Sequence, residues 1–380
     1  MRPRRSPTKR NLLLSLILAG LVFSVIEGLA FAVGWNLQSR GVFYRAPSVE
    51  NYGHYLAERH PLLGWPTRAA RELLDPSGSR WIPAYPEPGH ACVSLYGDSF
   101  TASIPVSDED SWPNLLSQRL ACRVANYGVG GYGTDQAYLR FKHNLADEAP
   151  ITVLVHFVED VRRNVNQLRN LVGQNRQILF KPRFVLDGDA LALVPLPSPR
   201  REEVEAWVAD PGRYLEHEYF VPGGASGITT LRFPFTLSIL SGFQNEHVRA
   251  KLAGETVRSR FYAASHPSGA LAVTGAILRE FRGDALARGK KPVILILPGG
   301  HDIERFHESG VWDSAPLVEW GRARGVPIHH LGPRLVAGLA GRDVCDFTAE
   351  HCYGHYDEAG YALVAEAVED ILRETQGTNF

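Results

Sequence analysis

A serine, a glycine-rich turn and a histidine lie at three separate places in the sequence, and together their types suit nucleophilic chemistry. The serine is Ser99, in the run Gly97-Asp98-Ser99 that follows a short apolar segment. A serine directly after a strand carries its hydroxyl to the mouth of a sheet, and its backbone N–H is available to an anion. Gly-Asp-Ser by itself is typical of an ordinary turn, and it is not the Gly-x-Ser-x-Gly elbow of the α/β-hydrolases.

The glycine-rich turn places four glycines within the six residues Gly128–Gly133, between a predicted strand and a predicted helix. Glycines let the backbone approach a ligand closely and point N–H groups at it. A phosphate-binding loop is one alternative, and a plain tight turn is another. The spacing fits neither the P-loop nor Gly-x-Gly-x-x-Gly, which disfavours a nucleotide-binding protein.

The histidine is His355, just before the last predicted helix. A lone histidine is more often structural or solvated than catalytic. One that lies in a loop at the rim of a sheet, however, is well placed to act as a general base.

The elements that must position these residues alternate between strand and helix from about residue 91 onward. Apolar runs predict strands at 92–96, 123–126, 151–158, 292–297 and 327–331. Periodic segments predict helices at 135–146, 272–288, 315–324 and 357–373. A fifth helix is predicted from the cap and first-turn proline of Asp110-Ser111-Trp112-Pro113, and it continues into Leu115, Leu116 and Leu120. This alternation predicts an α/β fold of three α/β/α layers around a parallel, flavodoxin-like sheet, whose ligands bind beyond the carboxyl ends of the strands.

The N-terminal residues 1–35 form a signal anchor or a signal peptide. Five basic residues precede the apolar run Leu12–Trp35, whose 24 residues are enough to cross a hydrocarbon core of about 30 Å. Ala30-Phe31-Ala32 has the small-x-small pattern of a cleavage site, so removal is the alternative. The basic flank predicts a single-pass protein of a bacterial-type inner membrane, with the rest of the chain on the periplasmic side.

The rest of the chain divides into a segment at 36–88, an irregular linker or wrapping segment, and a domain at 89–376. We expect an insertion at about 165–268 that covers one edge of this domain and contains a hairpin, 182–186 with 190–194. The net charge of −1 gives no indication of a nucleic-acid partner.

Export permits disulfides among the four cysteines. Cys92 and Cys122 each open a predicted strand, and these strands should be neighbours, so that a bridge is feasible. Cys345 and Cys352 are close enough in sequence for a local bridge. Three pairings are open, and no spacing favours a metal site.

The serine turn at Gly97–Ser99, the glycine-rich turn Gly128–Gly133 and the histidine His355 together resemble the SGNH (GDSL-type) hydrolase family of acyl esterases. The resemblance covers the framework from about residue 90 to 375, without the insertion. It places Ser99 at the nucleophile, and the backbone N–H groups of Ser99 and Gly131 in the oxyanion hole. His355, followed by Gly360 at the family's spacing, falls at the catalytic base.

Two positions depart from the family pattern. The third block normally reads Gly-x-Asn-Asp, with the asparagine donating to the oxyanion, but here Glu159 and Asp160 end the matching stretch. A carboxylate only accepts hydrogen bonds, so we expect Glu159 to turn away or be protonated, or another donor such as Asn164 to replace it.

The second departure is Cys352, which stands where the family has an acid three residues before the histidine. We expect His355 to be oriented by Asp346, Glu350 or a backbone carbonyl, or to act with the serine as a dyad.

The resemblance implies a serine-dependent ester hydrolase or O-acyltransferase that needs no cofactor or metal and works through an acyl-serine. With the predicted location, it makes small-molecule or glycan esters, such as acylated envelope glycans, the expected substrates. The two departures motivate an alternative, a non-catalytic glycan-binding or envelope-assembly module on the same scaffold.

Overall fold

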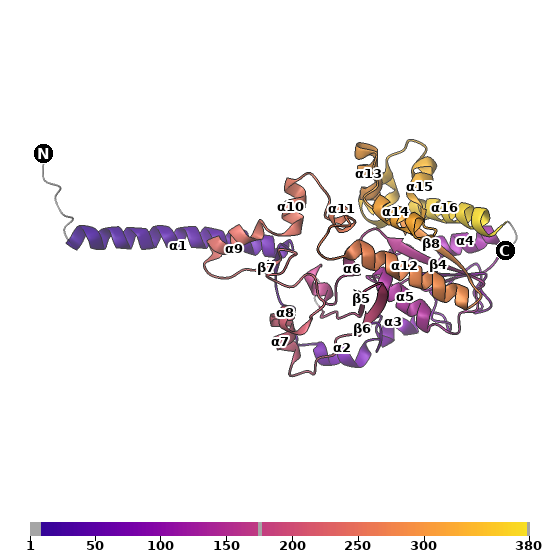
Figure 1. Ribbon diagram of the computed structural model, residues 1–380, viewed down its shortest axis with the longest axis horizontal. Helices are drawn as coiled ribbons and strands as arrows, with labels where there is room; N and C mark the ends of the chain where they lie inside the picture. The colour runs from indigo at the N-terminus through magenta and orange to yellow at the C-terminus, as the bar shows by residue number, and fades with distance from the viewer. Residues whose placement is uncertain (1–8, 174–176, 378–380) are drawn as a thin grey trace.

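A five-stranded parallel sheet forms the centre of the protein (Figure 1). The computed structural model describes residues 9–173 and 177–377, so that the basic residues Arg2, Arg4 and Arg5 lie outside the described part. The strand order is β3-β2-β4-β8-β9, which is the flavodoxin-like order 2-1-3-4-5. The predicted α/β fold is therefore confirmed. The strands are β2 (Val93–Tyr96), β3 (Val124–Asn126), β4 (Ile151–Phe157), β8 (Lys291–Leu297) and β9 (His329–His330).

The strand β4 lies at the centre of the sheet, and every one of its residues is buried. It pairs with β8 along its whole length, from Ile151 opposite Lys291 to Phe157 opposite Leu297. Burial on both faces explains its continuously apolar sequence. Because β4 is held between β2 on one side and β8 on the other, its carboxyl end fixes where the next residues, 158–164, can lie.

Helices cover both faces of the sheet. On one side α5 (Thr134–His143) packs against α12 (Ala270–Ala287), and on the other α4 (Trp112–Leu120) packs against α16 (Glu358–Gln376). These four helices were predicted, although α5 ends at His143 rather than near 146. The helices α14 (Ala315–Ala323), also predicted, and α15 (Gly332–Leu339) complete the layers with α13 (Gly300–Ser309).

The helices α13 and α15 were not predicted, because both begin at residues that signal loops. Gly299 precedes α13 and Gly300 is its first residue, and the carboxylate of Asp302 accepts a hydrogen bond from the N–H of Gly299 at 2.9 Å. Asp302 thus supplies the half of a capping box that the third helical residue contributes, while the N-cap residue, a glycine, has no side chain to supply the other half.

Residues 36–88 wrap around the sheet domain. They contain β1 (Phe43–Tyr44), α2 (Tyr52–Glu58) and α3 (Arg68–Glu72), and bury Tyr52 and Trp65. Arg80 donates to the carbonyl oxygens of Ser103 at 3.0 Å and Val106 at 2.7 Å. This arginine therefore holds the backbone just after Ser99.

The residues between α6 (Asp160–Arg163) and α12 form a second wrapping region. It begins with the short helix η1 (Arg169–Leu171) and the hairpin β5 (Arg183–Asp187) with β6 (Ala190–Val194), which confirms the predicted hairpin. The remaining elements are α7 (Val204–Ala209), α8 (Pro211–Tyr214), β7 (Thr229–Thr230), α9 (Phe235–Gly242), α10 (Glu246–Leu252) and α11 (Val257–Phe261).

The N-terminal helix α1 (Lys9–Ser39) is long and apolar enough to cross a membrane, and it projects away from the domain (Figure 1). The helix α6, which follows β4, lies on the side of the sheet from which α1 projects. The structure pairs Cys92 with Cys122 and Cys345 with Cys352, at Cα–Cα distances of 6.1 and 4.2 Å. The apolar helix and the disulfides indicate an extracytoplasmic domain.

A buried ion pair joins the wrapping region to the sheet domain. Lys181 is fully buried and pairs with Asp135 in the first turn of α5, and its ammonium group also donates to the carbonyl oxygens of Arg163 and Asn166 at 3.0 Å. Breaking such a pair leaves an uncompensated charge in the interior.

We therefore expect Lys181→Met to lower the free energy of unfolding by about 3–5 kcal/mol, as measured by urea denaturation. The double variant Lys181→Met/Asp135→Asn should recover a substantial part of this loss, because no buried charge is left alone. Equal stability of the single variant and the wild type would show that the ion pair does not stabilise the attachment of the wrapping region to the sheet domain.

Candidate active site

Ser99 lies three residues beyond the end of β2, in a tightly bonded turn. The Oδ1 of Asp98 accepts from the N–H of Phe100 at 2.9 Å, and the Ser99 carbonyl accepts from the N–H of Ile104 at 3.0 Å. Trp112, at the start of α4, donates its indole N–H to the Phe100 carbonyl at 2.9 Å. Within residues 9–173 and 177–377, neither the hydroxyl nor the N–H of Ser99 has a hydrogen-bond partner.

The glycine-rich turn packs directly against this serine turn. A Cβ atom on Gly128 would stand 2.4 Å from the backbone nitrogen of Ala102, so only glycine allows this approach. Gly131 has a φ of +77°, which also favours glycine. Its N–H has no partner in the described part of the chain. Two unpaired N–H groups, of Ser99 and Gly131, thus belong to adjacent turns, as the predicted oxyanion hole requires.

A tryptophan from the wrapping segment covers the glycine turn. Trp65 lies 3.9 Å from the position of a Cβ on Gly131, and its indole N–H donates to the Gly130 carbonyl at 2.9 Å. Tyr132 returns a hydrogen bond to the Trp65 carbonyl at 2.7 Å. The sequence analysis missed Trp65, because the segment that carries it shows no regular period.

His355 lies in β11 (Tyr353–Tyr356), which pairs with β10 (Thr348–Glu350). Its ring packs on Phe100, with the centroids 4.6 Å apart, and Phe100 stacks in turn on Phe157 at 3.9 Å. The structure therefore brings His355 to the residue next to Ser99. Its Nε2 is buried, and no group in the described part of the chain bonds to it.

The environment of His355 favours the neutral form of its imidazole. Burial lowers its pKa below 6.5, Arg163 lowers it further, and Asp98 and Glu350 act in the opposite direction. Asp346 and Glu350 are both exposed, and no hydrogen bond joins either to His355 among the described residues. A neutral imidazole is the form that accepts a proton.

Glu159 turns away toward two arginines. Its carboxylate contacts the guanidinium of Arg162 at 2.5 Å and that of Arg258 at 3.8 Å. Burial alone would raise the pKa of Glu159, but Arg162 and Arg258 bring it down to about 2. Of the alternatives that the sequence left open, a protonated Glu159 is therefore wrong, and the carboxylate is ionised.

Asn164 does not take the place of the missing donor. It is fully buried, its amide donates to Thr274 Oγ1 at 2.9 Å, and its oxygen accepts from the N–H of Asp135 at 3.1 Å. Both ends of the side chain are therefore used to join α5 to α12. The expectation that Asn164 could serve the oxyanion is corrected.

A residue that the sequence analysis missed, Arg163, lies between the two turns. Its Nη1 donates to Asp98 Oδ2, Asp160 Oδ1 and the Tyr132 carbonyl, each at 2.9 Å. Burial and the nearby Asp98 raise the pKa of Asp160 well above its usual value, whereas Arg163 lowers it. The signal that could have found Arg163 is its position three residues after Asp160, directly beyond a buried strand.

The second amino group of this guanidinium is free. Nη2 makes no hydrogen bond in the described part of the chain, and it is not among the fully buried unpaired atoms, whereas Nε is. The guanidinium carbon lies 5.8 Å from the Phe157 ring, which stacks on Phe100. The guanidinium thus bonds to Asp98 and Tyr132, which are the sequence neighbours of Ser99 and Gly131, and its Nη2 remains available as a charged donor.

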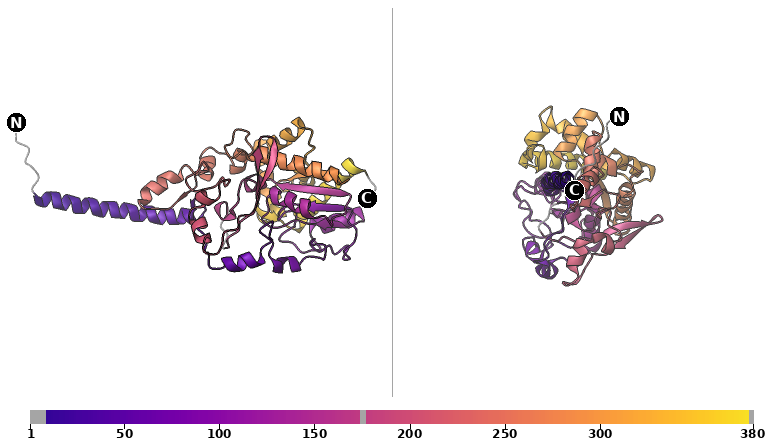
Figure 2. Two further views of the ribbon diagram at one scale, coloured as in Figure 1. Left: turned by 60° about the horizontal axis from the view of Figure 1, so that its bottom comes forward. Right: turned by 90° about the vertical axis from the view of Figure 1, so that its left-hand side faces the viewer.

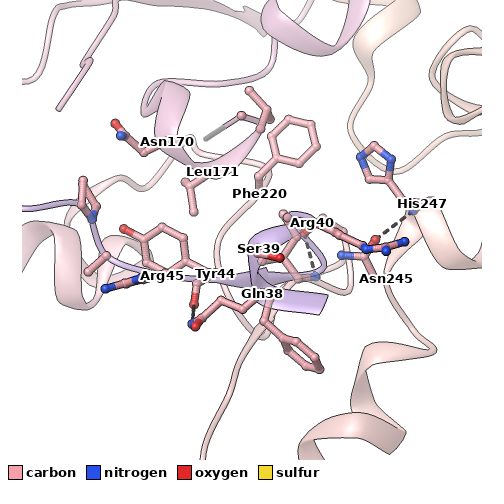
Figure 3. Close-up of a pocket in the computed structure, with 18 of the residues that line it drawn as sticks. Gln38, Ser39, Arg40, Tyr44, Arg45, Asn170, Leu171, Phe220, Asn245 and His247 are labelled. Atoms are coloured by element: carbon pink, nitrogen blue, oxygen red, sulfur yellow. Dashed lines mark hydrogen bonds between the residues drawn. The ribbon is translucent and has the colours of Figure 1, made fainter. Parts of the chain in front are cut away.

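A cavity of about 1080 Å³ lies elsewhere, between the end of α1 and the second wrapping region (Figure 3). Gln38, Arg40 and Tyr44 line it from one side, and Phe220 and His247 from the other. Ser99 and His355 do not line it. Arg162 is its link to the site, because this residue lines the cavity and also pairs with Glu159.

The pKa of His355 can be measured by histidine ring NMR, with the His355→Gln spectrum for assignment. We expect a value below 6.5, because burial disfavours the imidazolium form. Asp98→Asn should lower the value further, because it removes a stabilising negative charge. Asp346→Asn, at an exposed carboxylate, is the control and should leave it unchanged. A wild-type pKa at or above 6.5 would contradict the described environment.

Among known proteins, this chain is similar to solved structures only. No protein-family model and no curated protein matches the sequence. The chain is similar to a member of the lipolytic protein G-D-S-L family from Veillonella parvula, with 12% identity, coverage of 73% of this chain and 96% of that one, and a TM-score of 0.33.

Two esterases show a similar likeness. The psychrotrophic esterase EstA from Pseudoalteromonas has 9% identity over 74% of this chain and 96% of its own, with a TM-score of 0.34. A two-domain esterase active on acetylated mannans has 12% identity over 75% of this chain and 49% of its own, with a TM-score of 0.30. The neighbours across most of the chain are GDSL-type lipolytic proteins and esterases.

Proposed function

We propose that this protein is a serine-dependent ester hydrolase or O-acyltransferase that works through an acyl-serine. The observation that carries the proposal is the buried Nε2 of His355, which has no hydrogen-bond partner among the described residues and whose ring packs on Phe100, the residue after Ser99. A buried ring nitrogen without a partner is costly, and a serine hydroxyl that turns toward it would satisfy it. Catalytic hydrogen bonds often tighten only when substrate is bound.

In the proposed reaction His355 accepts the hydroxyl proton of Ser99, and the serine oxygen forms a bond to the ester carbonyl carbon. The N–H groups of Ser99 and Gly131 bind the resulting oxyanion. The bond from carbon to the leaving alkoxide then breaks, and His355 returns the proton to that alkoxide. Water, or a sugar hydroxyl, attacks the acyl-serine in the second half and releases the serine.

The guanidinium of Arg163 supplies the donor that the glutamate at position 159 cannot. Charge-assisted hydrogen bonds to an oxyanion are stronger than neutral ones. The guanidinium bonds both turns through Nη1, and its Nη2 has no partner among the described residues. The two aspartates that hold Nη1 fix the plane of the guanidinium, which makes the donor preorganised. Glu159 meanwhile is held away from the oxyanion by Arg162 and Arg258.

The proposed substrates are acyl esters on cell-envelope glycans. Support comes from the extracytoplasmic location and from the position of the carboxyl edge of the sheet, on the side from which α1 projects (Figure 1). Hydrolysis and transfer need the same serine, and the difference between them is whether water or a sugar hydroxyl reaches the acyl-serine.

Labelling with a fluorophosphonate probe tests the nucleophile. We expect the wild type to be labelled, Ser99→Ala to remain unlabelled, and His355→Ala to be labelled at least about 100-fold more slowly, because general-base catalysis contributes about that much. Ser103→Ala, at a buried serine four residues away, is the matched control and should be labelled like the wild type.

If folded wild-type protein is not labelled and yet retains acylated glycans, the alternative holds, and the chain is a binding module on an esterase scaffold. Labelling that persists in Ser99→Ala would place the nucleophile elsewhere.

The role of Arg163 is tested by Arg163→Lys, with Arg162→Lys as the matched control. Lysine keeps the charge but loses the planar fork, so we expect kcat on p-nitrophenyl acetate to fall by about 10²-fold with little change in KM, as for the loss of one oxyanion donor. Arg162→Lys alters a neighbouring arginine that bonds Glu159 instead, and should change kcat severalfold at most. Equal effects of the two substitutions would assign Arg163 a purely structural role.

A further inference from the structure

A short apolar helix lies outside the body of the domain. The helix α9 and its flanks, residues 231–243, lie alongside α1 in both side views (Figures 1 and 2), and the two helices are in contact. Four large apolar side chains of this segment are between 55% and 63% exposed: Phe233, Leu237, Leu240 and Phe243. An apolar surface of this kind marks an interaction site.

The neighbouring part of α1 is equally apolar and exposed, at Val22, Val25, Ile26, Leu29 and Val33. Aromatic contacts join the two surfaces, because Phe23 meets Phe233 at 6.1 Å and Phe31 meets Phe235 at 5.0 Å. A Cβ on Gly34 would stand 2.4 Å from Leu231 Cδ1, so the helices meet closely there. The exposed apolar surface is therefore continuous across α1 and α9.

Glu27 joins the two helices. It is the only acidic residue in α1, and it is only 4% exposed. Its carboxylate accepts hydrogen bonds from the N–H groups of Phe235 and Thr236 and from the Thr236 hydroxyl. The first turn of a helix presents unsatisfied N–H groups and the positive end of the helix dipole. The start of α9 thus satisfies the one carboxylate of the apolar helix.

A side chain of α9 also satisfies part of the backbone that precedes the helix. Pro234 has no N–H, and Ser238 Oγ accepts from the N–H of Arg232 at 3.0 Å while donating to the Arg232 carbonyl at 2.7 Å. Backbone polar groups in hydrocarbon must be satisfied inside the protein, and a carboxylate there is costly without a partner. The backbone of Arg232 meets the first requirement, and Glu27 meets the second through its contacts with the first turn of α9.

The depth of Glu27 follows from the helix geometry. Arg45 lies over the ring of Trp35 at 5.5 Å, a pair typical of the boundary between membrane and water. Glu27 is eight residues earlier in α1, which is about 12 Å deeper at 1.5 Å per residue. Half of a hydrocarbon core is about 15 Å thick. The joint with α9 therefore falls within the outer half of the bilayer.

We propose that residues 231–243 are embedded in the outer leaflet of the membrane, as a second apolar anchor held by Glu27 to an uncleaved α1. The occupant of the apolar surface is lipid hydrocarbon. Cleavage after Ala32 would remove Glu27 and leave the first amides of α9 without an acceptor. This proposal is independent of the proposed esterase activity.

Spin-label accessibility in vesicles tests the proposal on the full chain. A cysteine replaces Leu237 or Leu240, and the four native cysteines are held in two disulfides. In phosphatidylcholine–phosphatidylglycerol vesicles we expect both labels to collide more often with oxygen than with a water-soluble nickel chelate. A label at Leu145, an apolar residue that is 80% exposed on the domain, is the matched control and should show the reverse.

Nickel access at positions 237 and 240 equal to that at 145 would overturn the proposal. Exclusion of both reagents would also overturn it, because protein, such as a second copy, would then cover the surface. Intact-mass measurement should show the residues of α1 present in membrane-extracted protein, and loss of residues 1–32 would refute the joint.

The joint itself is tested by Glu27→Leu against Glu27→Gln. Glutamine keeps an acceptor oxygen, so the label at 237 should behave as in wild type, whereas leucine should raise its nickel accessibility severalfold. The thermal unfolding of the domain, measured alongside, should be the same in both variants. Unchanged accessibility in Glu27→Leu would show that the carboxylate does not hold α9.

Discussion

The packing of Phe100 is the interaction on which the candidate site depends. Its ring lies between Phe157, at the end of the central strand, and His355, in β11 more than 250 residues later. Its carbonyl oxygen accepts a hydrogen bond from the indole of Trp112. These contacts place a strand end, a helix start and the C-terminal hairpin around the serine at position 99. This apolar packing sets the distance between Ser99 and His355. The polar residues nearby have other hydrogen-bond partners and would not fix that distance by themselves.

Much of the fold could be predicted from local patterns. The strands β2, β4 and β8 correspond to short apolar runs, whereas β9 consists of two histidines within the predicted range 327–331. Burial on both faces explains why β4 shows no polar residue apart from Thr152 and His156. The five helices that were predicted have a periodic apolar face. The helix α13 was missed because its start is a pair of glycines, and its cap is an aspartate within the helix rather than before it.

The candidate site was predictable where the backbone conformation requires a particular residue type. Gly131 needs a positive φ, and its position in a glycine-rich turn is therefore visible in the sequence. Arg163 was not predictable, because its role depends on which carboxylates face it across the sheet, and Asp98 is 65 residues away. Asn164 was misjudged for the same reason, since its partner on α12 lies 110 residues later. Long-range partners decide the roles of polar residues, and local patterns do not contain them.

Two attachments to the membrane would constrain the domain differently from one. A single helix followed by an irregular linker lets a domain tilt and rotate relative to the bilayer. Two attachments, α1 and the α9 segment joined through Glu27, would restrict both motions. The second wrapping region carries α9, and its ion pair between Lys181 and Asp135 connects it to the first turn of α5, directly after the glycine-rich turn. The orientation of the oxyanion-hole turn relative to the bilayer would then be fixed through buried contacts. A substrate held at a constant height above the membrane would meet the site in one orientation, which agrees with the proposed acyl esters on cell-envelope glycans.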